Sequence, residues 1–477
     1  MSDTGDLLRR TADLAAAYLD TLDERPVFPE VTPEQLREAL GGPLPERPLP
    51  AEQVVDELVA AAEPGVVATG SGRYFGFVIG GALPAALAAD WLTSAWDQNA
   101  GLYVGGPSAS VVEQITRDWL LELLGLPGES SIGFVTGTQV AHVTGLAAAR
   151  WHVLEAIGWD VGREGLSGAP RIRVLAGEQR HVTVDRALRL LGLGAPTTVA
   201  ADDEGRMLPD ALAEALAGPA GPTIVCAQAG EVNTGAFDPL PEIASLARDA
   251  GAWLHVDGAF GIWAAVSPRL RHLVSGIELA DSWTTDAHKW LNVPYDSGIV
   301  LCAHPESHRA AMTVSASYLI QDEGARRVRD QVDWVPEFSR RARGFAVYAA
   351  LRSLGRSGVV ELVERCCDAA KRFAEAVVQL PGAELLNDVE LNQVLFRFET
   401  DEQTDEALRQ VQASGRVWLS GTTWKGRKAI RVSVSNWQTG DEEIDLAVSE
   451  FRAAAAMNRQ TDRPVVSDGR AGEARTP

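Results

Sequence analysis

Short apolar runs alternate with stretches of helical periodicity through the middle of the chain. The helical stretches place apolar residues three and four positions apart, and the runs between them are too short for helices. The runs predicted as strands are residues 132–136, 171–176, 197–200, 223–229, 252–257, 281–284 and 298–302. Strands that alternate with helices predict an α/β fold, with a mostly parallel central sheet covered by helices on both faces.

The helices predicted around these strands follow the same periodicity. They cover residues 83–96, 110–124, 140–157, 182–191 and 208–217. One more helix is expected after Asp238, which would cap it, with Pro239 in its first turn. In sheets of this kind, ligands bind beyond the carboxyl ends of the strands. A functional site is therefore expected where these strands end.

The pattern changes after residue 340, where two long helices are predicted at residues 341–354 and 358–380. Alternating apolar positions then predict a smaller α+β unit. Its strands are predicted at residues 391–398, 417–419 and 429–434, and its helices at residues 405–413 and 441–456. The last residues, 457–477, show no periodicity and are predicted to be disordered.

The beginning of the chain is proline-rich and mostly extended. An amphipathic helix is predicted at residues 6–22, with further helices at residues 33–40 and 51–62. This segment buries little by itself, so it is expected to pack on the rest of the chain or on a partner subunit. The predicted organisation is an N-terminal segment (1–70), a large domain (71–338), a small C-terminal domain (339–456) and a tail (457–477).

Charge and composition argue against several kinds of partner. The chain has 43 Lys and Arg against 65 Asp and Glu, a formal net charge of −22, which disfavours nucleic acid and anionic membranes. No run approaches the roughly 20 apolar residues of a membrane span, and the acidic N-terminus lacks signal-peptide features. The four cysteines lack metal-ligand spacing, so no metal site is predicted, and their low number suits the cytoplasm.

Two predicted strand ends carry groups whose chemistry fits together. Asp257 ends an apolar strand, and Lys289 follows the next strand, directly after His288. A lysine taken alone is most often a solvated surface group. A lysine paired with a buried carboxylate is what pyridoxal phosphate requires, because the lysine holds the cofactor as a Schiff base and the acid keeps its pyridine nitrogen protonated. The pair favours a pyridoxal phosphate site.

A glycine and hydroxyl turn lies between a predicted strand and a predicted helix. Gly137, Thr138 and Gln139 form this turn, so backbone N–H groups point out of a positive helix end. Such a turn suits phosphate, although many similar turns bind nothing. His181 and Glu231 also follow predicted strands and are expected at the same edge of the sheet.

Several sequence segments fit one known pattern when taken together and in order. The most specific holds Asp281-Ser282 and, at residues 286–291, the sequence DAHKWL; the others are HVDGAFG (255–261), NTGAFDP (233–239), SRRARG (339–344) and LGR (354–356). With these motifs the chain resembles the pyridoxal-phosphate-dependent amino-acid decarboxylases of the aromatic amino acid and glutamate decarboxylase group, which have fold type I. The resemblance covers roughly residues 70–450.

The resemblance implies roles toward the cofactor. Lys289 would form the Schiff base, Asp257 would pair with the pyridine nitrogen, and His181 would stack on the ring. His288 and the turn before residue 140 would hold the phosphate. The further cofactor contacts implied are Gly137, Thr138, Gln139, Asp286 and Glu231. A plainer role is open for His181, which could be a helix cap or a core residue.

The resemblance also implies a substrate site. Arg431 would grip the α-carboxylate of an amino acid, although an arginine on a strand could equally be a surface salt-bridge partner. Phe77 and Asn99 fall where the family lines its side-chain pocket, with Asn99 contributed by the partner chain; simple packing is the alternative for Phe77. Sites of this fold type are normally completed at a two-fold interface, so a homodimer is expected.

Three positions depart from the family pattern. The family's phosphate turn usually reads Ser-Gly-Gly-Thr-Glu-Ala-Asn, whereas residues 136–142 read TGTQVAH. Glu231 stands where a neutral polar residue is common, and its carboxylate would add negative charge near Asp257. Many aromatic decarboxylases carry a loop tyrosine that protonates the substrate carbon after carbon dioxide leaves. The corresponding residues, 321–335, hold no tyrosine, and Gln331 takes its place.

The expected activity is decarboxylation of an amino acid to an amine and carbon dioxide. Within the family, loss of the loop hydroxyl is associated with oxygen-dependent decarboxylation-deamination to an aldehyde, so this reaction is the first alternative. An aminotransferase on the same fold and a pyridoxal-binding protein without activity are the others. Neither the charge nor the pocket positions select one amino acid as the substrate.

Overall fold

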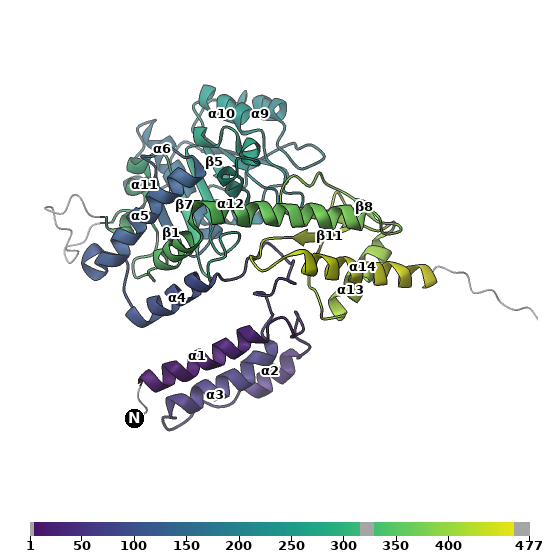
Figure 1. Ribbon diagram of the computed structural model, residues 1–477. Coiled ribbons are helices and arrows are strands. Elements are labelled where there is room, and N and C mark those ends of the chain that lie inside the picture. Colours follow the sequence, from purple (N-terminus) through teal and green to yellow (C-terminus); the bar gives the residue numbers. More distant parts are fainter. Residues whose placement is uncertain (1–3, 315–328, 462–477) are drawn as a thin grey trace, which may run out of the picture.

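The computed structural model describes residues 4–314 and 329–461, and its larger part is built around one sheet (Figure 1). The strands are β1 (Ser131–Val135), β2 (Arg173–Gly177), β3 (Thr197–Val199), β4 (Thr223–Gln228), β5 (Trp253–Asp257), β6 (Ser282–Asp286) and β7 (Gly298–Cys302). They lie in the order β1-β7-β6-β5-β4-β2-β3. Neighbours from β6 to β3 are parallel, and β7 is antiparallel to β1 and β6. This confirms the predicted α/β fold with a mostly parallel sheet.

The direction of β7 follows from its short connection to β6. Residues 287–297 join the two strands, whereas a parallel crossover needs about a dozen or more residues. The chain therefore turns back directly. Lys289 lies in this turn, at the carboxyl end of β6.

Helices cover both faces of the sheet. On one face, α6 (Thr138–Glu155) crosses the central strands and contacts α8 (Val182–Leu190) and α11 (Pro305–Met312), with the short α7 (Val161–Glu164) beside it. On the other face lie α9 (Pro209–Leu216) and α10 (Leu240–Asp249). Strand β4 shows the two-sided burial, because Ile224 and Cys226 enter one apolar cluster and Val225 and Ala227 enter another. Apolar clusters on both faces therefore hold the sheet, and loops lie at the carboxyl ends of its strands.

Asp238 does not cap the helix that follows it, so that prediction was wrong. Helix α10 begins after Pro239 without a side-chain cap. The Asp238 carboxylate instead accepts hydrogen bonds from the backbone N–H groups of Met207 and Gln228, each at 2.7 Å. Burial raises the pKa of this carboxyl to about 6. Its role is to join two loops rather than to start a helix.

A second, antiparallel sheet forms the C-terminal part, in the order β10-β11-β9-β8. Its strands are β8 (Glu384–Leu385), β9 (Gln393–Arg397), β10 (Ser420–Trp424) and β11 (Arg427–Ser433), and its helices are α13 (Asp401–Ala413) and α14 (Asp441–Thr461). The strand predicted at 417–419 was misplaced, because Trp418 bonds to the segment around Phe75 instead of to β11. Helix α14 also continues beyond the predicted start of the tail, and residues 462–477 lie outside the described part.

The two long helices predicted after residue 340 form one helical rod, α12 (Gly344–Val377). Gly355 interrupts it with φ 60° and ψ 178°, between the two predicted segments. The rod packs on α4 (Pro84–Trp96) and α5 (Pro107–Leu124), and reaches the second sheet through β9 and α14 (Figure 1). It therefore links the two sheets.

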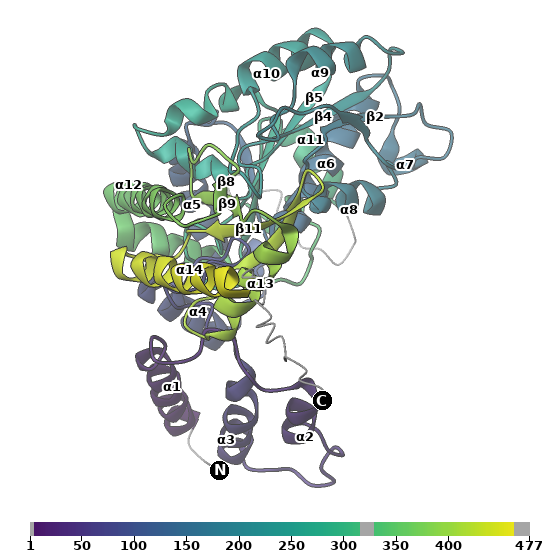
Figure 2. The same ribbon diagram turned by 90° about the vertical axis from the view of Figure 1, so that its right-hand side faces the viewer.

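Three helices at the N-terminus stand apart from both sheets (Figures 1 and 2). They are α1 (Thr4–Asp20), α2 (Pro33–Leu40) and α3 (Ala51–Ala62), at or close to the predicted positions, and none of their residues is buried. Arg10 on α1 pairs with Asp56 on α3 at 2.8 Å. Packing of this segment on a partner subunit stays a prediction, as do the domain boundaries. No helix in the described part of the chain combines the length and apolar character needed to cross a membrane.

Candidate active site

A cavity of about 260 Å³ opens at the carboxyl edge of the large sheet. It is lined by Gly137, Thr138, Gln139, His181, Thr183, Gln228, Gly230, Val232, Asp257, Ala259, Phe260, Asp286, His288 and Lys289. Eight residues predicted at the site are thus brought together from segments far apart in the sequence. They come from the ends of β5 and β6, the turn after β6, the start of α6 and the residue before α8.

Lys289 carries its amine into this cavity from the turn after β6. Its Nζ lies 2.9 Å from Oδ2 of Asp286, the last residue of β6. The other carboxylate oxygen of Asp286 accepts a hydrogen bond from the backbone N–H of Thr138 at 2.6 Å. Burial alone would raise the pKa of Asp286, but Lys289, His288 and this hydrogen bond lower it. Asp286 therefore joins the lysine to the start of α6.

Asp257 presents a buried carboxylate at the end of β5, with 6% of its surface exposed. Its Oδ1 accepts a hydrogen bond from the backbone N–H of Ala259 at 3.1 Å, and its Oδ2 lies 3.3 Å from Nε2 of His142. Burial would raise the pKa of Asp257, but His142, His181 and Lys289 hold it below the usual range. The residue is thus kept as an anion in a nearly dry place.

His181 is a helix cap that also lies in the cavity wall, while its stacking on the cofactor ring stays a prediction. It is the N-cap of α8, and its Nδ1 lies 2.8 Å from the hydroxyl of Thr183. Its ring also lines the cavity. Burial lowers the pKa of His181, with Asp257 opposing the shift. The cap fixes the ring in the cavity wall, because it holds Nδ1 against the helix start.

The start of α6 offers donors that suit an anion. Helix α6 begins at Thr138, whose N–H donates to Asp286, and the N–H groups of Val140 and Ala141 donate to the Gly137 carbonyl oxygen, so the N–H of Gln139 is the one in this turn without a partner among the described residues. The hydroxyl of Thr138 is buried without a hydrogen-bond partner among the described residues and can donate to an anion. Gly298 lies directly behind the turn, where a Cβ would come within 2.3 Å of Gly137 Cα. The turn is therefore held against β7, with unused polar groups facing the cavity.

His288 lies beside this turn. Its Nδ1 accepts a hydrogen bond from the backbone N–H of Ser297 at 3.0 Å, and its ring stacks on Tyr295 at 4.2 Å. Burial lowers the pKa of His288, and Asp286 opposes the shift. Because Nδ1 accepts, the proton of the neutral ring belongs on Nε2. That nitrogen is the donor His288 can offer to the cavity.

Arg431 and Glu231 lie behind the cavity wall rather than among its lining residues. Nη1 of Arg431 donates to the carbonyl oxygen of Val232, which lines the cavity, at 2.8 Å. Glu231 turns into its own loop, where its carboxylate accepts hydrogen bonds from Asn233 and Thr234 at 2.6–3.2 Å. Burial raises the pKa of Glu231. A direct cofactor contact of Glu231 finds no support in this geometry.

Phe77 and Asn99 are not brought to the cavity within one chain. Phe77 has a positive φ of 53°, is 55% exposed and packs against Trp418. Asn99 is exposed, and its Oδ1 accepts a hydrogen bond from the backbone N–H of Arg340. Their roles in a substrate pocket stay predictions that depend on a second chain.

Two polar residues that the sequence did not single out lie in the cavity wall or behind it. Gln228 ends β4, and its Oε1 accepts a hydrogen bond from the His181 backbone at 3.2 Å. His142 touches Asp257 from one turn inside α6, four residues after Thr138. His142 lay in a segment that departs from the family pattern, and its helical spacing from the turn was the signal available. Gln228 carried no such signal.

The amino-acid sequence matches the conserved domain of pyridoxal-dependent decarboxylases over residues 33–399. That match covers most of the chain, including every strand of the large sheet and the residues that line the cavity. The chain belongs to the pyridoxal-dependent decarboxylase family. Its cofactor is therefore pyridoxal 5′-phosphate, and the protein is an amino-acid decarboxylase.

The names of the relatives of this decarboxylase describe two activities, aldehyde synthesis and decarboxylation. Phenylacetaldehyde synthase of Arabidopsis thaliana is 26% identical over 458 residues, which cover 91% of this chain and 92% of that protein. Tryptophan decarboxylase 1 of Oryza sativa subsp. japonica is 29% identical, with 91% and 90% covered. The crystal structure of Oryza sativa TDC with PLP and tryptamine has a TM-score of 0.89 and 25% identity, and covers 96% of this chain and 98% of that one.

The residues present fit the cofactor. A lysine amine, an anionic carboxylate and an imidazole ring line one cavity, and the unpartnered hydroxyl of Thr138 lies at the helix start, where it can donate to a phosphate. Of the loop that carries a tyrosine in many aromatic decarboxylases, residues 321–328 of this chain lie outside the described part. Gln331 is described: it begins a short 3₁₀ helix and is fully buried.

Proposed function

We propose that this decarboxylase removes the α-carboxylate of an L-amino acid as carbon dioxide and releases the amine. The observation that carries the proposal is the state of Arg431. Arg431 is only 8% exposed, and its guanidinium forms no salt bridge among the described residues, although Glu231 lies near enough to act on its pKa. Nε has no hydrogen-bond partner, and Nη2 has only a 3.5 Å contact with Ser420. The Nε–Nη2 edge is the fork that binds a carboxylate with two parallel hydrogen bonds.

Three residues of the cavity wall, and Arg431 behind it, have tasks in this proposal. Bound pyridoxal phosphate supplies an electron sink for the electron pair left at the α-carbon when the bond to the carboxylate breaks. Lys289 would hold the cofactor covalently, would be displaced by the amino group of the substrate, and would displace the amine product in turn. Asp257 would keep the pyridine nitrogen protonated, and His181 would hold the ring from one face. Arg431 would keep the carboxylate out of the plane of the ring, which makes its bond the one that breaks.

Oxygen-dependent formation of an aldehyde is the second candidate. It is favoured by Gln331, which stands where a tyrosine proton donor is expected, because a glutamine amide does not supply a proton of that kind. In this reaction one oxygen and one water are consumed, and carbon dioxide, ammonia, hydrogen peroxide and an aldehyde are released. The name of the Arabidopsis thaliana relative also supports keeping this candidate.

We further propose that the enzyme is a cytoplasmic homodimer. The four cysteines are free and buried, which suits a reducing compartment. The N-terminal helices leave apolar side chains exposed, among them Leu8, Val54 and Leu58, each 47–57% exposed. Such side chains on helices without a core of their own support a role in subunit contact.

The product mixture tests the proposal. The holoenzyme is given a panel of amino acids, aromatic ones included, in air and under nitrogen, and carbon dioxide, amine, aldehyde, ammonia, peroxide and oxygen are measured. Amine equal to carbon dioxide in both atmospheres supports the main proposal. Oxygen uptake with ammonia and aldehyde supports the second candidate, and release of no carbon dioxide from any amino acid contradicts both.

Lys289 is tested in parallel. Lys289→Ala is expected to lower activity by at least roughly a hundredfold, and borohydride treatment followed by peptide mass analysis should find the cofactor on Lys289 of the unmutated protein. Lys425→Ala is the matched control, since Lys425 pairs with Asp203 on the surface. Full activity of Lys289→Ala, or a label on another lysine, would overturn this role.

A further inference from the structure

A line of polar side chains runs through the interior to Asp257. Trp253, His255 and Asp257 occupy alternate positions of β5, so they face the same side of the sheet, the side covered by α6. Ser282 on β6 is paired directly with His255, and His142 reaches down from α6. None of the five is more than 6% exposed. Five polar groups in one dry layer call for an explanation beyond packing.

Short contacts connect these groups one after another. The indole Nε1 of Trp253 donates to Oγ of Ser282 at 2.9 Å, and that Oγ lies 2.7 Å from Nδ1 of His255. Nε2 of His255 lies 2.9 Å from Nδ1 of His142. Nε2 of His142 lies 3.3 Å from Oδ2 of Asp257 and has no other polar partner among the described residues. The line is therefore continuous from the start of β5 to its end.

The two ends of the line decide its direction. An indole N–H can only donate, and a carboxylate can only accept. If both imidazoles are neutral, Ser282 donates to His255, His255 donates from Nε2 to His142, and His142 donates from Nε2 to Asp257. Burial lowers the pKa of His255 to about 3, which keeps this ring neutral. Every dipole of the line then points its positive end toward Asp257.

We propose that His142, held by His255, Ser282 and Trp253, is a positioning residue that stabilises the anionic form of Asp257 and so keeps the proton on the cofactor's ring nitrogen. The inference rests on the proposed placement of that ring against Asp257. It extends the proposed function, because it assigns the control of the ring's charge to residues that do not touch the cofactor. The other titratable groups that act on Asp257 are His181 and Lys289.

The packing around the line leaves room for both imidazole rings. Gly145 lies one turn after His142 on α6, and a Cβ there would come within 3.0 Å of Cε1 of His255. A glycine at this helical position thus makes room for the second imidazole. His142 itself stands where the family's usual turn has an asparagine, so a two-imidazole line is a feature of this chain rather than of the general pattern.

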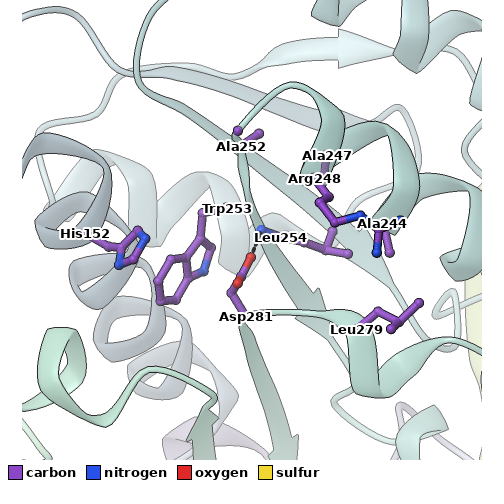
Figure 3. Close-up of a pocket in the computed structure, with 10 residues that line it drawn as sticks. His152, Ala244, Ala247, Arg248, Ala252, Trp253, Leu254, Leu279 and Asp281 are labelled. Atoms are coloured by element: carbon purple, nitrogen blue, oxygen red, sulfur yellow. Dashed lines mark hydrogen bonds between the residues drawn. The ribbon is translucent and has the colours of Figure 1, made fainter. Parts of the chain in front are cut away.

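The outer end of the line does not exchange protons with solvent. Trp253 is 2% exposed and lies with His152 and Asp281 on the wall of a second cavity of about 290 Å³, at the far end of β5 (Figure 3). The indole does not release its proton at working pH, so the line ends there. It acts as a fixed row of dipoles and not as a path for protons.

Two substitutions at position 142 separate the two contacts of its ring. Glutamine places an amide nitrogen about where the imidazole has Nε2, so His142→Gln keeps the donor to Asp257. Asparagine matches Nδ1 instead, so His142→Asn keeps the contact to His255 and loses the one to Asp257. Ser282→Ala removes the donor to His255 from farther back. His308→Asn is the control, since His308 is fully buried with both ring nitrogens bonded, to Ser131 and Trp334, away from Asp257.

The readouts do not depend on turnover. The dissociation constant for pyridoxal phosphate is measured on the cofactor-free protein. The proton on the ring nitrogen is followed by the ¹⁵N resonance of ring-labelled cofactor in the full-length protein. The thermal midpoint of the cofactor-free protein reports folding. Expected results are a roughly tenfold weaker affinity and a shifted ¹⁵N resonance in His142→Asn, a smaller shift in Ser282→Ala and in His142→Gln, which loses the contact to His255, and values near the unmutated protein in His308→Asn.

Asp257→Asn separates failure of this inference from failure of the proposed function. If Asp257→Asn leaves the ¹⁵N resonance in place, the ring is not against Asp257 and the proposed placement is wrong. If Asp257→Asn shifts the resonance and His142→Asn and Ser282→Ala do not, the line has no influence and the inference is wrong. Equal losses in His142→Gln and His142→Asn would also overturn it, because the donor to Asp257 would then not matter.

Discussion

Arg431 shows how a single buried residue can point to a substrate. A guanidinium with little exposed surface normally has a carboxylate partner, because burying an unpaired charge is costly. Arg431 has none among the described residues, and burial lowers its pKa. The free-energy cost of burying this charge is offset when a ligand supplies the missing negative charge. This state of Arg431 is the basis of the proposal that its guanidinium pairs with the carboxylate of an amino acid.

Arg431→Lys tests this role. Lysine keeps the charge but cannot form two parallel hydrogen bonds, so kcat/KM for the amino acid should fall about ten- to a hundredfold, as expected for losing ~1.5–3 kcal/mol of charge-assisted hydrogen bonding. Arg397→Lys is the control, since Arg397 lies buried on the adjacent β9 and pairs with Asp401 at 3.2 Å. Inhibition by the amine product, which lacks the carboxylate, should be unchanged in Arg431→Lys. Equal loss of amine and amino acid binding would contradict the assignment.

For single residues, the sequence predicted which edge of the sheet a residue lies at better than it predicted where the side chain points. Lys289, Asp257 and His181 lie at strand ends, so the fold class alone brings them to one edge of the sheet. Glu231 lies at a strand end too, but the turn that follows offers its carboxylate several backbone and side-chain donors, and it faces away. The choice between cavity and loop depends on local hydrogen bonds that a strand-end rule does not contain.

Among the elements, buried strands were the easiest to predict. Strands β1, β4 and β7 are buried along their whole length and appear as apolar runs. Strand β10 lies in the smaller sheet and is buried only at its ends, so its Gly and Thr positions gave no such run. Helix α13 starts at Asp401 rather than at the predicted 405, because Thr400 accepts a hydrogen bond from the Gln403 backbone. Side-chain caps of this kind set helix limits that periodicity leaves open.

Gly355 interrupts helix α12, and its replacement tests whether the fold requires this break in the helix. Its φ of 60° and ψ of 178° lie in a region open essentially to glycine, and no atom crowds a Cβ there. Gly355→Ala should therefore lower the free energy of unfolding by ~1–3 kcal/mol through backbone strain alone. The measurement is chemical denaturation of the holoenzyme.

Ser357→Ala is the control for that variant, because Ser357 is also exposed and lies in the same rod two residues later. It should change the unfolding free energy by less than about 0.5 kcal/mol. If Gly355→Ala were as stable as this control, the rod could close into a regular helix at no cost. The kink would then not be a fixed feature of how α12 joins the two sheets.

At the scale of the whole molecule, one chain holds a cofactor cavity but not all of the predicted substrate pocket. Phe77 and Asn99 face outward, and the three N-terminal helices carry no buried residue. A sequence read as one chain can name such residues through a family resemblance. The sequence does not show which surfaces a second copy of the chain would cover. The predicted roles of Phe77 and Asn99 therefore depend on dimer formation.

Subunit complementation decides whether Asn99 serves the neighbouring site. Lys289→Ala and Asn99→Arg chains are each expected to be inactive, the first without its cofactor anchor and the second with a bulky cation in the substrate pocket. Unfolding and refolding them together gives mixed dimers. If Asn99 acts across the interface, each mixed dimer has one site with an intact lysine and an intact asparagine, and random mixing restores about a quarter of the unmutated activity. If Asn99 acts within its own chain, every site lacks one of the two residues and no activity returns. Sedimentation must show dimers in both cases, because a monomeric protein with full activity would remove the basis of the expected shared site.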